Sequence, residues 1–284
     1  CFAPHGPLHS LPLQALKWTN DQYLIERFGV CITPSATVLK YCQTKNRIRN
    51  VRMKHKPETC FVAAVGALEN DPSDFETDVD FLEPKFSRDR FLSLKGSQAT
   101  KEKILHNIGG KDIIHLACHG LFVGDLGLDP LESGFMFSDG GPAKSLHSLM
   151  NAFQDGSSMP NDASTYFLTA REVFNLSLNA DLITLRACSS GRSKLLSGDE
   201  IMGLTRSFLY AGTPSLIVSL WNVNIKSSNI LLKEFYNSWI NHSNPLPKWK
   251  ALQLAQISMI KQSERNDYHH PYHWASLTLI GDWL

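Results

Sequence analysis

The sequence carries no strong charge bias and no long apolar run. Its 28 lysine and arginine residues are nearly balanced by 27 aspartate and glutamate residues, so the formal net charge is +1. A protein that binds a phosphate backbone across a broad surface needs a basic field, and this balance therefore does not favour a nucleic-acid partner. We find no stretch long enough to cross a bilayer and no signal peptide at the start, so no membrane contact is predicted.

The spacing of the cysteines also shows no disulfide or metal-binding pattern. The six of them, at positions 1, 31, 42, 60, 118 and 188, do not have the close spacing of a disulfide framework, and there is no Cys-x-x-Cys pair. A chain of 284 residues can bury a core without disulfides. We therefore expect reduced cysteines, a cytoplasmic location, no zinc site and no cofactor.

Two short apolar runs each end in a reactive side chain followed by small residues. The run at 112–120, DIIHLACHG, ends in His119 and Gly120, and the run at 181–191, DLITLRACSSG, ends in Cys188. Runs of this kind predict buried parallel strands, and chemistry collects past the carboxyl ends of such strands. We therefore expect an imidazole and a thiol at the same edge of one sheet.

A Cys–His pair in that position can carry out acyl transfer. A nearby imidazole lowers the pKa of a thiol or accepts its proton, and this produces the nucleophilic thiolate. The backbone N–H groups of Gly120 and Cys188 are the expected donors to an oxyanion, because glycine allows a carbonyl to approach closely. The structural alternative is that Cys188 is an inert buried thiol, since free cysteine is among the most buried residue types.

Strand and helix signals alternate through the main part of the chain. We predict strands near 60–66, 90–94, 112–119, 181–187, 215–220 and 277–280, with the strand at 90–94 at an edge of the sheet. We predict a helix over about 100–107 with Thr100 as its cap, a helix over 198–210, and a long helix or helix pair over 226–262. The segment 168–172, LTARE, resembles a capped helix start. This alternation is typical of a three-layer α/β/α sandwich with a mostly parallel central sheet.

The remaining segments are less regular. In the first block, 1–56, we expect a short strand at 29–33 and a helix start at 33–37. The basic stretch 45–56 is interpreted as a solvated linker rather than a nucleic-acid patch. The acidic stretch 71–83 is expected to be a loop or irregular surface.

An irregular insertion is expected near 140–166, which is rich in Gly, Ser, Asn, Asp and Pro. A loop of that length is a lid, an activation loop, a self-cleavage linker or a plain surface insertion.

Five motifs in order resemble those of the CHAT family, a group of caspase-like domains related to separases and often found behind tetratricopeptide repeats. The opening motif is 3–16, APHGPLHSLPLQAL, and the two strand ends form the second. The helix after the nucleophile follows at 198–212, the next strand at 215–223, and the closing signature at 270–275 and 279–282. On this resemblance, 1–56 is the N-terminal part of the CHAT region and 57–284 is the peptidase domain. The opening Cys1-Phe2-Ala3 indicates a piece of a longer chain.

The resemblance implies a cysteine endopeptidase of the caspase and separase type. Cys188 is then the nucleophile, and His119 is the general acid or base. Two alternatives stay open. One is a catalytically silent pseudoprotease that acts as a protein-interaction module, and the other is a non-proteolytic Cys–His hydrolase or acyltransferase.

Substrate specificity is expected to involve Arg186, two residues before the nucleophile, which could pair with an acidic substrate side chain. Alternatively, Arg186 is already paired with Asp199 or Glu200. Trp221 and Asn222 could wall the cleft or pair with an extended substrate. His115 is expected to be a hydrogen-bonded sheet residue and Cys118 a core residue, so neither is assigned to a metal site.

The expected partners follow from the same resemblance. They are a protein substrate and a regulatory partner or upstream tetratricopeptide-type domain. A CRISPR effector or another sensor in an antiviral defence or cell-death pathway is a further candidate.

Overall fold

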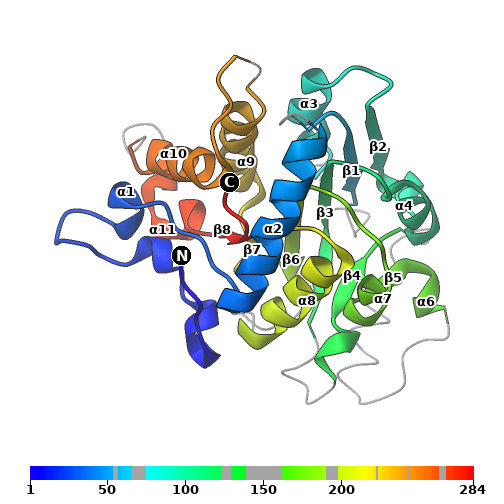
Figure 1. The fold of residues 1–284 in the computed structure, drawn as a ribbon, viewed down its shortest axis with the longest axis horizontal. Coiled ribbons are helices and arrows are strands. Elements are labelled where there is room, and N and C mark those ends of the chain that lie inside the picture. The colour runs from blue at the N-terminus through cyan, green and yellow to red at the C-terminus, as the bar shows by residue number, and fades with distance from the viewer. Residues whose placement is uncertain are drawn as a thin grey trace.

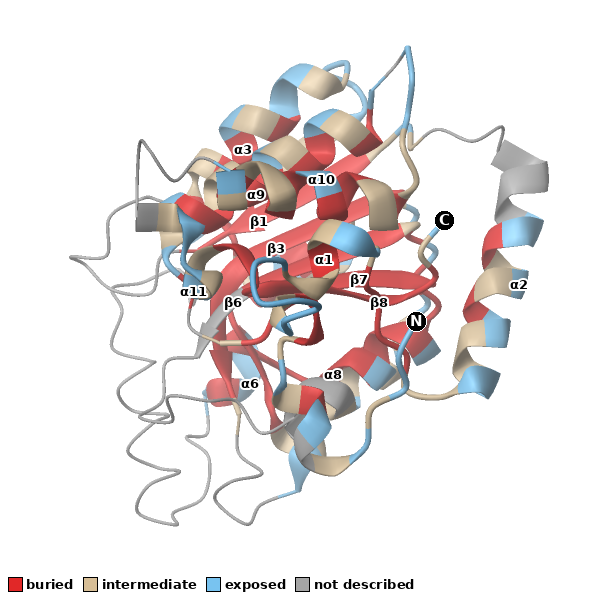
Figure 2. Ribbon diagram, turned by 90° about the vertical axis from the view of Figure 1, so that its left-hand side faces the viewer, coloured by how far each residue is buried: buried red, intermediate tan, exposed pale blue. Residues whose placement is uncertain are grey.

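The computed structural model describes residues 1–53, 57–65, 75–122, 129–138, 162–189, 198–221, 223–241, 243–261 and 267–284. Figure 1 shows the described chain as one mixed α/β body in which helices surround a central sheet. The inner strands of that sheet are buried, as the strands of a sheet covered on both faces should be, whereas the residues at 91–95 are half-buried (Figure 2).

The described strands form one sheet with the order β2-β1-β3-β6-β7-β8. The strands on this path are β2 (Phe91–Lys95), β1 (Cys60–Ala64), β3 (Ile113–Leu121), β6 (Leu182–Ser189), β7 (Ser215–Ser219) and β8 (Leu277–Gly281). The first five run parallel, whereas β8 is antiparallel to β7. Two short strands, β4 (Gly134–Met136) and β5 (Phe167–Thr169), add an antiparallel pair beside the last residues of β3. The expected mostly parallel sheet is confirmed.

Helices cover both faces of this sheet. The α-helices among the described residues are α1 (Leu24–Arg27), α2 (Ala36–Met53), α3 (Thr77–Leu82), α4 (Lys101–Asn107), α6 (Ala163–Tyr166), α7 (Ala170–Phe174), α8 (Gly198–Ala211), α9 (Ile225–Trp239), α10 (Lys248–Lys261) and α11 (Pro271–Trp274). Figure 2 shows α3, α9 and α10 on one side of the sheet and α8 on the other, and this gives the three-layer α/β/α arrangement.

Several local predictions are confirmed by the caps and pairings. Thr100 accepts a hydrogen bond from the Lys103 N–H and begins α4. Thr169 and Glu172 form a reciprocal capping box at the start of α7, which is the N-terminal signature of a helix. The 226–262 region is a helix pair, α9 and α10, and β2 lies at the edge of the sheet as expected.

Three local predictions are wrong. Residues 29–33 make only isolated bridges, of Ile32 with Phe2 and Ile280, and not a regular strand. The basic stretch from 45 continues α2 as far as Met53, since its lysine and arginine residues favour helix as well as solvent. The acidic stretch 71–83 contains α3, whose Asp78 is fully buried.

The first 53 residues pack onto the end of the sheet. The Ile32 N–H donates to the Leu279 carbonyl at 2.8 Å, and the Gly281 N–H donates to the Ile32 carbonyl at 2.9 Å. The buried amide of Gln14 donates to the carbonyls of Ala275 and Leu277 at 2.7 and 3.3 Å. The free edge of β8 is therefore covered by the N-terminal segment.

Most of the insertion expected near 140–166 lies outside the described residues. The part that is described, from 162, forms α6 and leads into β5.

Candidate active site

His119 and Cys188 lie side by side on adjacent strands. The parallel register of β3 and β6 pairs His119 with Cys188 and Gly120 with Ser189. Neighbouring strands of a sheet lie about 4.8 Å apart, so the backbones of His119 and Cys188 are direct neighbours. Both positions fall in the last part of their strands, at the carboxyl edge where the sequence predicted them. The side chain of Cys188 lies outside the described part of the structure.

The His119 side chain is nearly enclosed. Only 8% of its surface is exposed. On the side away from β6, His119 pairs with Met136 of β4, because β1 has already ended and β4 takes its place along β3. The ring of Phe75, which comes just before α3, meets the imidazole edge-to-face with the ring centroids 5.7 Å apart. Phe75 is itself only 1% exposed, so this contact is made in the interior.

A buried ion pair lies on the same face of the sheet. Arg186, two residues before Cys188 on β6, places its Nε atom 2.9 Å from the Asp78 Oδ2 atom of α3, and neither side chain is exposed. The Nη1 atom of Arg186 also donates to the side-chain oxygens of Ser228 and Asn229 on α9. The guanidinium lies over the Phe75 ring, with its Cζ atom 4.6 Å from the centroid.

The same Asp78 oxygen also holds His115. The Nε2 atom of His115 lies 2.7 Å from Asp78 Oδ2, and its Nδ1 atom lies 3.2 Å from the Tyr236 hydroxyl. That hydroxyl is in turn 2.7 Å from the Thr184 hydroxyl of β6, and burial raises the pKa of Tyr236. His115 is therefore hydrogen-bonded within the sheet layer, as the sequence predicted. One carboxylate oxygen joins β3 and β6, the two strands that carry the candidate dyad.

These contacts bear on the expected role of Arg186. A guanidinium with no exposed surface that is paired with Asp78 is not open to a substrate side chain in this structure. Asp78 is a partner that the sequence analysis did not name. The side chains of Asp199 and Glu200 lie outside the described part.

The other expected cleft residues have mixed outcomes. The indole N–H of Trp221 donates to the Tyr272 carbonyl at 3.2 Å, and the two rings stack at 6.4 Å. Trp221 thus lies just past the carboxyl end of β7, near β6 in the strand order. Asn222 lies outside the described residues. Gly120 lies within β3, between its register partners Phe135 and Ser189.

Three of the other described thiols are poorly suited to nucleophilic chemistry. Burial raises the pKa of Cys31 and of Cys42 to about 11, and burial raises the pKa of Cys60 further. Cys118 is fully buried, as expected of a core residue, and Cys1 is exposed. At neutral pH the three thiols whose pKa is raised are protonated, and they are therefore weak nucleophiles.

The described residues contain no group of three or more His, Cys, Asp and Glu side chains that could hold a metal ion. In the closing segment, His273 Nδ1 lies 3.0 Å from the Ser227 hydroxyl, and its ring contacts that of Tyr268 at 4.9 Å. These are packing contacts between α11 and its neighbours. No helix in the ranges that the structure describes is both long and apolar enough to cross a membrane.

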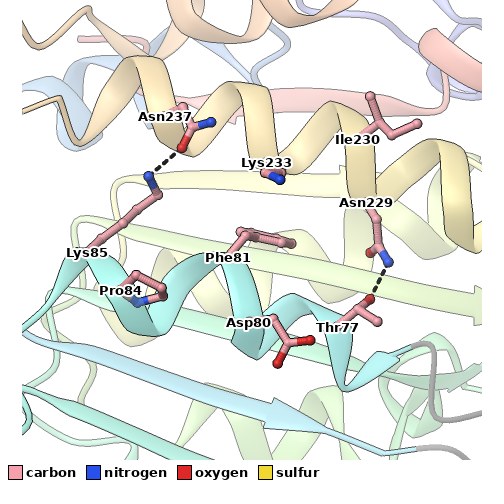
Figure 3. Close-up of a pocket in the computed structure, with 9 residues that line it drawn as sticks. All are labelled: Thr77, Asp80, Phe81, Pro84, Lys85, Asn229, Ile230, Lys233 and Asn237. Carbon is pink, nitrogen blue, oxygen red and sulfur yellow. Dashed lines mark hydrogen bonds between the residues drawn. The ribbon is translucent and has the colours of Figure 1, made fainter.

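A pocket of about 570 Å³ lies between α3 and α9 (Figure 3). Its lining residues are Thr77, Asp80, Phe81, Pro84, Lys85, Asn229, Ile230, Lys233 and Asn237. Figure 3 shows the Asn229 amide bonded to Thr77 and the Lys85 ammonium bonded to Asn237. Burial lowers the pKa of Lys85, and the nearby Lys233 charge lowers it further. The lining does not include His119 or Cys188, so this pocket is separate from the dyad.

The CHAT domain family model matches residues 1–282, nearly the whole chain. The chain belongs to the CHAT domain family. Tetratricopeptide repeat protein 28 of Homo sapiens is 27% identical to it over 300 residues, and the protein of the same name from Mus musculus is 25% identical over the same length. Each alignment covers 97% of this CHAT domain but only 12% of the relative, so the chain spans about an eighth of those proteins.

A solved structure shows the same fold. The CHAT domain superposes on a chain of the Saccharomyces cerevisiae separase–securin complex with a TM-score of 0.56 and 12% identity. The match covers 96% of the CHAT domain and 15% of the separase-complex chain. The CHAT domain therefore has the caspase-like α/β fold.

Sequence reasoning missed two residues of this CHAT domain: Phe75, which contacts His119, and Asp78, which contacts His115 and Arg186. Both lie in or beside a short helix within the acidic stretch 71–83, and Asp78 meets partners 37 and 108 positions away. One signal was present. The Arg186 charge in an otherwise apolar strand requires a buried counter-charge, and this requirement could have directed attention to an acidic residue elsewhere in the chain.

Proposed function

We propose that this CHAT domain is a cysteine endopeptidase with His119 and Cys188 as its catalytic dyad. The observation that carries the proposal is the parallel register that pairs these two positions at the carboxyl edge of adjacent strands. Residues paired across a parallel ladder project to the same face of the sheet, so an imidazole and a thiol at these positions are within reach of each other. The caspase-like fold and the family membership support the same assignment.

The reaction follows from the chemistry of the two groups. His119 accepts the thiol proton, and the Cys188 sulfur forms a bond to the scissile carbonyl carbon. The C–N bond then breaks, and the leaving amine takes the proton from His119. Water, deprotonated by His119, adds to the thioester, and the C–S bond breaks to release the acid and restore the thiol. The N–H groups of Gly120 and Cys188 stabilise the oxyanion in both steps.

Trp221 is proposed to contact substrate past the end of β7, together with Asn222 and Asp199. Its indole already lies beside Tyr272, so an aromatic wall is available there. Arg186 is not retained as the specificity residue for an acidic side chain, because its guanidinium is fully buried against Asp78.

We propose that the domain rests in a closed state and is activated by a partner. The low exposure of His119, 8%, supports this, because a substrate carbonyl must reach the imidazole before proton transfer can occur. The names of the curated relatives make a tetratricopeptide-repeat region one candidate activator. A CRISPR effector acting in antiviral defence is another candidate trigger, taken from the family resemblance alone.

The test is cleavage of a tiled peptide library by the wild type beside Cys188→Ala and His119→Ala. Cys118→Ala is the matched control, since it removes a thiol from the strand of His119 without touching the dyad. We expect cuts that disappear in both dyad variants and persist in the control. Cuts that persist without Cys188 would overturn the assignment.

An interaction module is the second candidate, and the enclosure of His119 favours it equally. It predicts no cleavage even with candidate activators present, and partner binding that is unchanged by Cys188→Ala and His119→Ala. A non-proteolytic hydrolase predicts turnover of small acyl esters without peptide cleavage.

A further inference from the structure

The Phe75 ring packs against the His119 imidazole, and the Arg186 guanidinium lies over the same ring. Its edge-to-face packing against the imidazole fixes one side of a side chain that must stay aligned with a thiol for proton transfer. Phe75 lies outside the regular helix α3, which begins at Thr77, so the helix alone does not fix its ring. Something else must hold the ring in place.

The Arg186 guanidinium supplies that support. Its Cζ atom lies 4.6 Å from the Phe75 centroid, within cation–π range, and both side chains are buried. The guanidinium is itself fixed by Asp78 on one side and by Ser228 and Asn229 of α9 on the other. A planar group held from several directions is a rigid platform.

The arrangement also ties the two catalytic strands together. Arg186 is two residues before Cys188 on β6, and His115 is four residues before His119 on β3. Both contact the same Asp78 oxygen, so a relative shift of the strands would break one of two buried contacts. The dyad geometry is thereby linked to α3.

We propose that Phe75 is a positioning residue for His119, and that the Asp78–Arg186 ion pair holds Phe75 in that position. This inference rests on the proposed function, because it assigns a role in aligning the same dyad. It replaces the expected substrate-binding role of Arg186 with a role in preorganising the site. A residue of this kind acts on the rate through the imidazole and does not touch substrate.

The test measures the reactivity of the Cys188 thiol, which needs no known substrate. Alkylation by iodoacetamide is followed from pH 5 to 9 by peptide-resolved mass spectrometry in a Cys1→Ser background, because Cys1 is exposed. In the wild type we expect an apparent thiol pKa below the free value of about 8.5, and an upward shift of that pKa in His119→Ala. The variants of interest are Phe75→Leu and Phe75→Met. Methionine is included because its flexible side chain fills the space left by the ring.

Phe75→Leu is expected to shift the alkylation profile toward that of His119→Ala and to lower the rate at pH 7 by about two- to tenfold, the range of a lost aromatic contact. In the His119→Ala background the same substitution should have no further effect on that rate. Phe81→Leu is the matched control. It removes a ring from α3 that contacts His115 at 6.4 Å and lies away from the dyad, so it should lower the melting temperature and leave the profile unchanged.

Two results would overturn the inference. One is an unchanged profile in both Phe75 variants when each retains a cooperative melting transition. The other is an equal shift in Phe81→Leu, which would indicate general loosening. If His119→Ala itself leaves the profile unchanged, the proposed dyad is wrong. That outcome is distinct from a His119-dependent profile that does not respond to Phe75.

Discussion

Removing the charge of Asp78 should be one of the most destabilising single changes in the chain. Asp78→Asn leaves the Arg186 guanidinium buried without its counter-ion, and it weakens the contact to His115. Breaking a buried pair by removing one partner typically costs about 3–5 kcal/mol of unfolding free energy. For a chain of this size that is a fall in melting temperature of roughly 10 °C. Guanidinium denaturation followed by far-UV circular dichroism measures the free energy directly.

Two comparisons make the reasoning refutable. Asp80→Asn, two residues along α3, removes a carboxylate that is 70% exposed and 3.9 Å from Lys95, and it should cost about 0–1 kcal/mol. The double variant Asp78→Asn with Arg186→Met removes both charges and should cost less than the sum of the two single variants. A loss below about 1 kcal/mol for Asp78→Asn with an unchanged denaturant slope, or strict additivity in the double variant, would contradict the assigned ion pair.

Two further changes test other parts of the fold. Burial raises the pKa of Asp282, so folding favours its protonated form, and this contribution to stability is lost as the pH rises through the folded-state pKa. The unfolding free energy of the wild type relative to Asp282→Asn should therefore increase between pH 7 and pH 4 in urea titrations, and a constant difference would contradict this. Gly134→Ala would place a methyl group 2.2 Å from the Leu168 carbonyl oxygen and should cost on the order of 1–3 kcal/mol in thermal unfolding. Gly109→Ala, which meets nothing within 4 Å, is its control, and equal losses in the two variants would refute the steric argument.

The parts of the fold that were predictable from the sequence are those with local signals. The apolar runs that become β3 and β6 predict their own strands, and the order of His119 and Cys188 within them predicts their shared edge. Thr100 and Thr169 predict helix starts because the capping bond spans only three residues. Each of these signals is contained within a few residues.

The parts that were missed depend on distant contacts. Asp78 lies in a stretch whose acidic composition predicts solvent exposure, and it is buried only because Arg186 and His115 arrive from strands formed much later in the chain. The position of Phe75 against His119 likewise has no local pattern. An arginine in an apolar strand indicates that Arg186 needs a buried counter-charge. The sequence does not show which carboxylate provides that charge, because the answer depends on how α3 packs over the sheet.

The covered edge of β8 has a consequence for handling the domain. A strand at the border of a sheet presents unpaired N–H and C=O groups that can recruit another chain. Here the Ile32 backbone forms hydrogen bonds with the Leu279 carbonyl and the Gly281 N–H. The Phe2 backbone in turn bonds to Cys31 and Thr33, on either side of Ile32. A chain shortened past Thr33 would therefore leave the edge of β8 uncovered. We expect such a fragment to self-associate through that edge even if the rest of its sheet is intact.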